Sequence, residues 1–532
     1  MEHAHPVSVE SEKFSWKGGP GYRPLVLVIM TIVFAIWLLL PAPQTILNMM
    51  TEENPSGYVM SGKATTIVEN ISLTLKKELT AEDAAFKVKV MVGLLLFTAL
   101  LWGTEALPLG ATDLLVGVIM YLFFIMQPDA IAKAYAQDAV FFVFGVLAVA
   151  VGVSTTGLDK RIGFLLLSKI KSLTGFCFIF LPSIAISASF LSEHALVALL
   201  VPVLMGVYKA SCKANGIEKD PALGIFLLLG LCFAANHGGP GSPAAGGRNA
   251  IMVGFLDQYG APISFLEWMK YGMPFVPVMA AVVGAYMMLM FRRKIKCKNI
   301  NPSEVVKAEV AKMGPFRGKQ MIMGIILLTL VILWIALGEE FGLGGPTLFA
   351  VVLMMIFRIV TWEDIQHRVH FDVVGLYAAA CAIGKGLTLT GGALWMARSF
   401  VSALPDFLGH GKGIVVAVSL VSGTITNFMS DGATVASVGP VMLPMAQLGG
   451  AHIWQVGLAC AFASSFANFL IVGTPNNAIA FAMGKDPETG ERLLKATDFV
   501  KYGLPVLLLA WAVLWGWAVF GYWTWLDWPV IK

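Results

Sequence analysis

A series of long apolar runs, which recurs from residue 24 to residue 522, constrains the fold of this chain more than any other feature. Most of these runs approach the roughly 20 apolar residues that a helix needs to cross a lipid bilayer. Only 13% of the residues are charged, against about 25% in soluble domains. The chain is therefore expected to be an all-α polytopic membrane protein embedded in a lipid bilayer. Its net charge of +4 is small and indicates no nucleic-acid partner.

Lys and Arg in short loops mark the cytoplasmic side of such a protein. Their distribution is self-consistent only if the long runs 162–207 and 396–447 each enter and leave the membrane on one side. We therefore expect about 11 transmembrane helices plus two re-entrant hairpins. The N-terminus lies inside and the C-terminus outside in this topology.

Four regions follow from this pattern. They are 1–89 (cytoplasmic N-terminus, first transmembrane helix and external loop), 90–293 (first repeat, with hairpin 162–207 and broken helix 220–256), 294–318 (basic cytoplasmic linker) and 319–532 (second repeat, with hairpin 396–447 and broken helix 453–484). The two repeats are expected to have opposite orientations. An inverted-topology repeat of this kind is typical of secondary transporters.

The two hairpins carry matching polar motifs. "SFLSEHALVALLVP" (189–202) aligns without a gap to "NFMSDGATVASVGP" (427–440), so that Glu193 falls on Asp431. The broken helices also match, since "CFAANHGGPGSPAAGGRNAIM" (232–252) and "CAFASSFANFLIVGTPNNAIA" (460–480) share a first Cys and an "NAI" segment. An acid at membrane depth is a functional-site hypothesis by default, and here it occurs twice.

The chemistry of these segments suits ions. Hydroxyl, carboxylate and backbone carbonyl oxygens at the hairpin tips can ligate a hard cation. The breaks would begin new half-helices, whose N–H groups and positive dipole ends suit an anion. Arg248 can bind a carboxylate or sulfate in two-pronged fashion, or it can neutralise Glu193. His194 and His237 can donate to an oxyanion, carry a proton, or serve as structural hydrogen bonders.

The order of hairpin and broken helix, repeated twice, resembles the divalent anion–sodium symporter family, most specifically in "SSFANFLIVGTPNNAIAFAMG" (464–484). The resemblance implies a homodimer, with a scaffold and a mobile transport domain in each subunit, that works by an elevator motion. It further implies that hairpin tips and helix breaks bind sodium ions and substrate. The corresponding substrate-binding candidates are Ser192, Glu193, His194, Arg248, Asn249, Ser430, Asp431, Gly432, Thr474 and Pro475. The cation-binding candidates are Ser192, Glu193, Gly246, Asn249, Ser430, Asp431, Gly473 and Asn477.

The sequence departs from the family pattern at the site itself. Many members read Ser-Asn-Thr at each tip, whereas this chain reads Ser192-Glu193-His194 and, in the second tip, Ser430-Asp431-Gly432. The first break has Gly246-Gly247-Arg248-Asn249 in place of Thr-Pro-Pro. Two added acids would repel a free dianion, so bound cations or Arg248 must offset them first.

Sodium-coupled symport of a small divalent anion, sulfate or a C4-dicarboxylate, is the expected function, with protons as the alternative coupling ion. The second hypothesis is a cation/proton antiporter that uses Glu193 and Asp431. No nucleotide-binding loop, HExxH or GxSxG occurs, so we expect no enzyme. The six cysteines show no metal or disulfide spacing. We expect a bacterial inner membrane protein.

Overall fold

The computed structural model describes residues 22–60, 62–168, 170, 172–297, 303–486 and 488–530. The expected cytoplasmic N-terminal tail lies outside these residues, as does the middle of the basic linker, 298–302. The described residues are helical, with turns and connecting segments between the helices, and form no strand beyond isolated bridges. The expected all-α architecture is therefore confirmed.

The helices up to the linker are α1 Pro24–Leu39, α2 Gln44–Met50, α3 Ile67–Leu75, α4 Ala81–Thr104, α5 Leu109–Leu122, α6 Pro128–Tyr135, α7 Asp138–Thr156, α8 Leu158–Ser168, α9 Leu173–Gly175, η1 Phe176–Phe180, α10 Leu181–Ala188, α11 Glu193–Ala214, α12 Pro221–Asn236, η2 Gly239–Gly241, η3 Pro243–Ala245, α13 Gly247–Gln258, α14 Phe265–Gly272 and α15 Phe275–Phe291.

The helices that follow are α16 Ser303–Met313, α17 Lys319–Phe341, α18 Gly344–Ile356, α19 Trp362–Arg368, α20 Phe371–Thr390, α21 Gly392–Ala403, α22 Asp406–Gly409, α23 Lys412–Ile425, α24 Asp431–Leu448, α25 Ile453–Ala463, α26 Pro475–Met483, α27 Ala496–Asp498, η4 Phe499–Gly503, α28 Leu504–Val513, η5 Leu514–Val519 and η6 Tyr522–Thr524. Among the described residues, eight helical stretches are long and apolar enough to cross a membrane, or nine if α1 and the bent α2 form one span.

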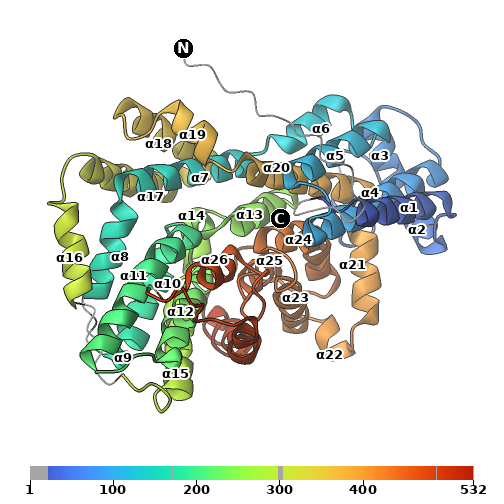
Figure 1. Ribbon diagram of the computed structural model, residues 1–532. Coiled ribbons are helices and arrows are strands. Elements are labelled where there is room, and N and C mark those ends of the chain that lie inside the picture. Colours follow the sequence, from blue (N-terminus) through green and yellow to red (C-terminus); the bar gives the residue numbers. More distant parts are fainter. Residues whose placement is uncertain are drawn as a thin grey trace.

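The long helices form two groups. In Figure 1, α17, α7, α20 and α4 run in a row across the upper half of the view, and neighbours in this row are packed together. The hairpins and broken helices lie below this row, with α10–α12 on one side and α23–α25 on the other. Residues of α13 and α24 lie near the middle, where both groups meet.

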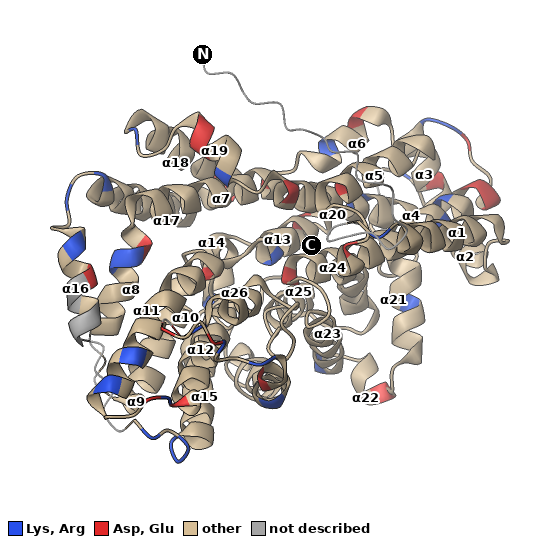
Figure 2. Cartoon of the chain, in the orientation of Figure 1, with Lys and Arg blue, Asp and Glu red and all other residues tan. Residues whose placement is uncertain are grey.

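Several apolar helices carry no charged residue. Figure 2 shows α10, α12 and α15 without a charged residue, whereas Lys, Arg, Asp and Glu appear on α16, α19 and the connecting segments. Glu193 and Arg248 are buried charges near α13 and α24, and Lys89, Asp113 and Asp159 are among those buried elsewhere. A charge in a membrane interior is costly unless it is paired, and Arg248 forms ion pairs with Glu193 and Asp431 near the centre of the molecule.

Each hairpin turns at a serine. Ser192 and Ser430 are the N-caps of α11 and α24, and each hydroxyl accepts a hydrogen bond from the backbone N–H three residues on, at 3.3 Å. Capping satisfies one of the N–H groups that a helix start leaves unpaired. The sequence alignment of the two tips therefore corresponds to the same local structure in both halves.

The two halves pack into each other reciprocally. Hairpin helix α11 of the first half packs against α26, the half-helix after the second break. Conversely, α24 of the second hairpin packs against α13, the half-helix after the first break. Residues of each break therefore face the hairpin of the other half as well as their own.

The hairpins begin later than the apolar runs suggest. Helix α8 begins before run 162–207 and ends within it, at Ser168, and the arms of the first hairpin are the segment from Leu173 to Ala188 and α11. In run 396–447, α21 and α22 precede the arms α23 and α24. The turn at Pro405 and the positive φ of Gly411 separate these helices. Hydropathy alone merges helices that such short turns divide.

Candidate functional site

Both hairpin tips meet at one guanidinium. Arg248, at the start of α13 and only 1% exposed, donates to Glu193 at 3.0 and 3.3 Å through its two terminal nitrogens. The Nη1 atom also donates to Asp431 Oδ2. Glu193 and Asp431 come from different tips, 55 and 183 residues from Arg248. The two acids that the sequence alignment paired therefore both contact Arg248, which lies in the first helix break.

The cluster has one negative charge in excess. Two carboxylates face a single guanidinium, and the Nε of Arg248 is buried with no hydrogen-bond partner among the described residues. His194 lies at the edge, with Nε2 3.9 Å from Glu193 Oε1 and a side chain 38% exposed. We call Glu193, Arg248 and Asp431 the tip cluster.

Glycines make room for the tip cluster. A side chain on Gly239 would overlap the Arg248 guanidinium and the Ser465 hydroxyl. One on Gly247 would overlap the ring of Tyr377, which comes from α20 in the upper row of helices. Glycine at these positions permits the close approach of backbone and side chains. Tyr377 therefore links the row of long helices to the site.

The two helix breaks share one hydrogen-bond pattern. The Asn249 side-chain NH₂ donates to the carbonyls of Gly239 and Ser242, both at 2.8 Å, which are 10 and 7 residues before it. The Asn477 NH₂ donates to Ala467 and Leu470, both at 2.9 Å, again 10 and 7 residues before it. Both amides are fully buried, and within the described part of the chain neither Oδ1 has a hydrogen-bond partner.

Each break is also fastened to its own hairpin. The Ser189 hydroxyl donates to the Gly238 carbonyl at 2.8 Å. The aligned residue Asn427 donates to the Phe466 carbonyl at 3.2 Å and accepts from the N–H groups of Asn468 and Phe469, at 3.0 and 3.1 Å. A tip and its break thus form one unit in each half.

An amide chain connects the halves. His194 Nδ1 lies 2.8 Å from Asn476 Oδ1, and the Asn476 NH₂ donates to Asn236 Oδ1 at 2.8 Å. The Asn236 NH₂ donates to the Ala467 carbonyl at 3.1 Å. Because an amide oxygen only accepts, Nδ1 of His194 carries the hydrogen. This chain runs from the first tip through both broken helices.

The remaining candidates lie close to the same centre. Thr474 and Pro475 begin α26, with Thr474 4% exposed. A side chain on Gly432 would touch Tyr377 at 3.3 Å, and one on Gly473 would touch the Thr426 carbonyl at 3.0 Å. Gly246 adjoins Arg248. His237 is buried in the first break, where Nδ1 donates to the Phe233 carbonyl at 2.7 Å.

Sequence reasoning missed three participants: Tyr377, Asn236 and Asn476. The latter two stood in the quoted break segments, where their amides gave the only signal. Tyr377 comes from a helix outside both motifs, and nothing in the alignment of the halves indicates it. The metal ligands expected at Glu193 and Asp431 stay a prediction, since the partner that the structure gives both is Arg248.

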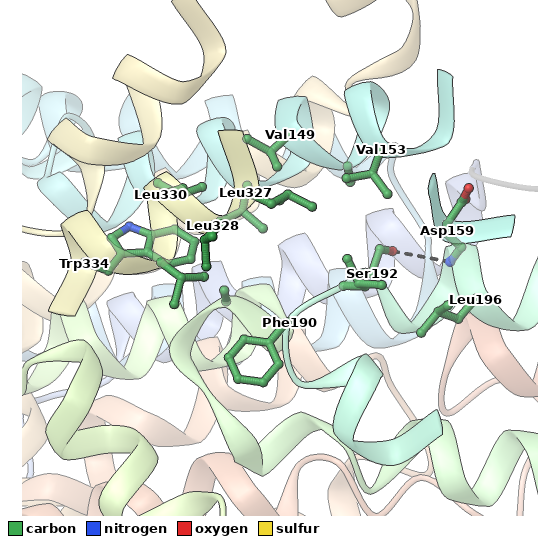
Figure 3. A pocket seen from close by; sticks show the side chains of 16 residues that line it. Val149, Val153, Asp159, Phe190, Ser192, Leu196, Leu327, Leu328, Leu330 and Trp334 are labelled. Carbon is green, nitrogen blue, oxygen red and sulfur yellow. Dashed lines mark hydrogen bonds between the residues drawn. The ribbon is translucent and has the colours of Figure 1, made fainter. Parts of the chain in front are cut away.

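A cavity of about 300 Å³ lies beside the first tip. Figure 3 shows its wall from α7 and α17 on one side, with Val149, Val153, Leu327 and Trp334, and Phe190 and Ser192 of the tip on the other. Ala244 of the first break also lines it, and Asp159 is its only ionisable lining residue. The cavity thus adjoins the tip next to Glu193 and is mainly apolar.

The site contains buried side-chain oxygens that have no hydrogen-bond partner among the described residues. Among the residues that the structure describes, no three His, Cys, Asp or Glu side chains gather as a metal group. Near the two breaks, the buried side-chain oxygens without a hydrogen-bond partner among the described residues belong to Asn249, Asn477 and Ser465. Oxygen ligands of this kind suit hard cations.

An all-helical membrane protein whose two hairpin tips and two helix breaks meet at a buried, charged centre has the architecture of a secondary transporter, not of an enzyme. The chain belongs to the family described as the sodium:sulfate symporter transmembrane region, whose profile matches residues 81–528. The family assignment expected from the sequence is therefore confirmed.

The individual relatives are also described as membrane proteins or transporters. A membrane protein of Cupriavidus necator is 25% identical over 82% of this chain and 88% of its own length. The sodium-dependent dicarboxylate transporter SdcS of Staphylococcus aureus is 25% identical over 76% of this chain and 82% of its own. The crystal structure of the Alcanivorax borkumensis YdaH transporter matches in fold, with a TM-score of 0.50, 15% identity, and coverage of 85% of this chain and 100% of that one.

Proposed function

We propose that this protein is a sodium-coupled symporter of a small anion that works by an elevator motion. The observation that carries the proposal is the matched pair of breaks, in which the NH₂ groups of Asn249 and Asn477 donate to backbone carbonyls while each buried amide oxygen has no hydrogen-bond partner among the described residues. The name of the SdcS relative supports sodium as the coupling ion.

Each break would hold one sodium ion. A buried amide oxygen without a hydrogen bond costs about 1–3 kcal/mol, and a bound cation would remove that cost. Gly246, Ser192 and Asn249 are the ligand candidates of the first half, and Gly473, Ser430 and Asn477 those of the second. Backbone carbonyls of the breaks would complete each shell, as hard cations prefer oxygen.

Cation binding would precede anion binding. The tip cluster is negative overall, so an anion meets repulsion until sodium ions add positive charge. Arg248 is held by two carboxylates and is satisfied on its terminal nitrogens. The resemblance implies that the substrate is a divalent anion, either sulfate or a C4-dicarboxylate. The negative charge of the tip cluster would weaken the binding of such an anion until cations are bound.

The remaining features follow the family expectation. The row with α7, α17 and α20 would be the scaffold, and the hairpins with their breaks the mobile transport domain. Residues 90–293 and 319–532 would be inverted repeats, each with a re-entrant hairpin. We propose a homodimer in a bacterial inner membrane, with the N-terminus inside and the C-terminus outside.

Purified protein in proteoliposomes tests the coupling. An inward sodium gradient should drive uptake of a labelled anion, and replacing sodium by potassium should abolish it. An internal pH dye is read in parallel. A sodium-driven pH change without uptake of any anion would overturn the proposal in favour of cation/proton antiport through Glu193 and Asp431.

A further inference from the structure

We infer that Cys212 and Cys297 form a modification site, at which oxidation joins the two thiols in a disulfide that restrains the basic linker 294–318. Their Sγ atoms lie 3.9 Å apart, although the residues are 85 positions apart in the chain. Cys212 belongs to the last turn of hairpin arm α11, and Cys297 lies in the linker, shortly after α15. Both thiols are free, as are those of the other four cysteines.

The start of the linker is held beside the hairpin arm. The Asp220 side chain accepts hydrogen bonds from the backbone N–H groups of Lys296 and Cys297, at 2.7 and 2.9 Å. Asp220 is itself fixed as the N-cap of α12, where its other oxygen accepts from the N–H of Leu223 at 3.3 Å. Because α11 and α12 are packed together, these bonds keep Cys297 next to Cys212.

The gap between the two sulfurs is short enough to close. A disulfide has an S–S bond of about 2.05 Å, so the sulfurs would approach each other by about 2 Å from their contact at 3.9 Å. Cys297 lies in a connecting segment outside the helices, where the backbone adjusts more easily than inside a helix. The approach therefore requires only a local shift of the linker.

The pair is expected to rest as two thiols. Each cysteine is 1% exposed, and burial raises the pKa of the Cys297 thiol to about 12, so the resting pair reacts slowly. Lys209, Lys213 and Lys219 place the end of α11 on the expected cytoplasmic side. Disulfides in that compartment are usually transient, and they often sense the redox state.

Hydrogen peroxide is an oxidant of the required class. One thiol attacks a peroxide oxygen, the O–O bond breaks, and a sulfenic acid and one water form. The second thiol then attacks the sulfenic sulfur, the S–S bond forms, and a second water leaves. Both sulfurs are thereby oxidised, and the peroxide is reduced to water. A dithiol such as dithiothreitol reverses the change by thiol–disulfide exchange.

The disulfide would make permanent a contact that hydrogen bonds hold reversibly. Beyond Cys297 the linker leads through α16, which packs on both α8 and α11, into α17 of the row of long helices. The linker thus connects the proposed mobile domain to the proposed scaffold. A bond from its start to α11 shortens the chain available between the two and should slow a motion that separates them. This effect rests on the proposed elevator motion, whereas the cross-link itself does not.

Peptide mapping by mass spectrometry tests the site. The full chain in proteoliposomes is treated with hydrogen peroxide, remaining thiols are alkylated, and the peptide that links Cys212 to Cys297 is quantified without reduction. We expect this peptide to be the main disulfide product, and dithiothreitol to remove it. Sodium-driven uptake of labelled succinate or sulfate by the same vesicles should fall severalfold on oxidation and recover on reduction.

Variants separate this site from oxidation elsewhere. Cys212→Ser and, independently, Cys297→Ser should abolish both the linked peptide and the sensitivity of uptake to peroxide. Their uptake in the reduced state should stay near that of the unmodified protein, and it reports correct folding. Cys177→Ala, which alters a buried cysteine of the first hairpin, is the matched control and should keep both responses.

The outcomes are distinct. Absence of the linked peptide from the peroxide-treated unmodified protein would overturn the inference, whatever the transport result. Linked protein that transports as fast as reduced protein would overturn the restraint of the linker. Peroxide-sensitive uptake in both serine variants would assign the effect to another residue and overturn that restraint as well. Absence of sodium-driven uptake by the reduced protein would overturn the symporter proposal, and the peptide map would still decide the cross-link.

Discussion

Asn249 and Asn477 occupy equivalent positions in the two helix breaks, and each donates to the carbonyls 10 and 7 residues before it. Their distances agree to 0.1 Å, at 2.8 and 2.9 Å. The pattern fixes the loop of each break against its following half-helix. It also leaves the same amide oxygen buried and without a partner in the described chain, on both sides of the site.

Removing either amide should weaken sodium binding. Asn249→Ala and Asn477→Ala each delete one oxygen ligand and two hydrogen bonds, which contribute about 1 kcal/mol apiece. We expect each variant to need roughly tenfold more sodium for half-maximal stabilisation, measured as the sodium dependence of the melting temperature in detergent. Asn48→Ala, on the exposed side of α2, is the control. Sodium curves that match the unmodified protein in both variants would refute the assignment.

Removing the shared guanidinium should unfold the site. Arg248→Met leaves the buried Glu193 and the partly buried Asp431 without a countercharge, and breaking a buried pair in this way costs about 3–5 kcal/mol. Adding Glu193→Gln and Asp431→Asn to the same chain should restore most of the melting temperature. Arg398→Met is the comparison, because its pair with Glu52 is partly exposed, and such pairs are worth about 1 kcal/mol or less. Equal losses in both arginine variants would contradict this account.

Gly247 should not tolerate even a methyl group. Gly247→Ala brings a Cβ into the Tyr377 ring, and overpacking of this kind costs about 1–3 kcal/mol. We expect a lower melting temperature and slower transport. The additional change Tyr377→Leu should recover stability if the ring is the cause. At Gly409, where a Cβ meets no atom within 4 Å, Ala should be neutral. A stable Gly247→Ala protein would show that Tyr377 can move aside freely.

The link between hairpin and break can be tested at Asn427. Asn427→Ala removes the acceptor for the N–H groups of Asn468 and Phe469, and each buried group left unsatisfied costs about 1–3 kcal/mol. Cleavage by a protease added to the folded protein should increase within 464–474, read by mass spectrometry. Thr424→Ala, on the exposed face one turn away, should leave the cleavage pattern unchanged. Absence of extra cleavage would mean that the break holds its shape without the hairpin.

The sequence was informative where the chain repeats itself. The alignment of the two tips predicted that Ser192 and Ser430 are equivalent, and both are N-caps at 3.3 Å. The alignment could not predict that Glu193 and Asp431 share one guanidinium, since chain spacing does not say which residues meet across 183 positions. The sequence allowed either a substrate or Glu193 as the partner of Arg248. In the structure, Arg248 contacts both Glu193 and Asp431.

Two further features could not be predicted from the sequence for a similar physical reason. Tyr377 belongs to a helix that carries no motif, and only packing brings it over Gly247 and Gly432. The predicted hairpins, 162–207 and 396–447, begin before the arms that the structure shows, because hydropathy does not register a short turn such as that at Pro405. Whether the hairpins re-enter on one side of the membrane stays a prediction, as do the 11 spans.

The reciprocal packing of α11 on α26 and of α13 on α24 has a consequence for biosynthesis. His194 and its partner Asn476 are 282 residues apart, so the first hairpin leaves the ribosome long before the helix it must pack against exists. Contacts of such separation slow folding, because a long loop must close before they form. Until then Glu193 and Arg248 lack Asp431, and His194 lacks Asn476. The first tip therefore completes its contacts only after the second half has been synthesised.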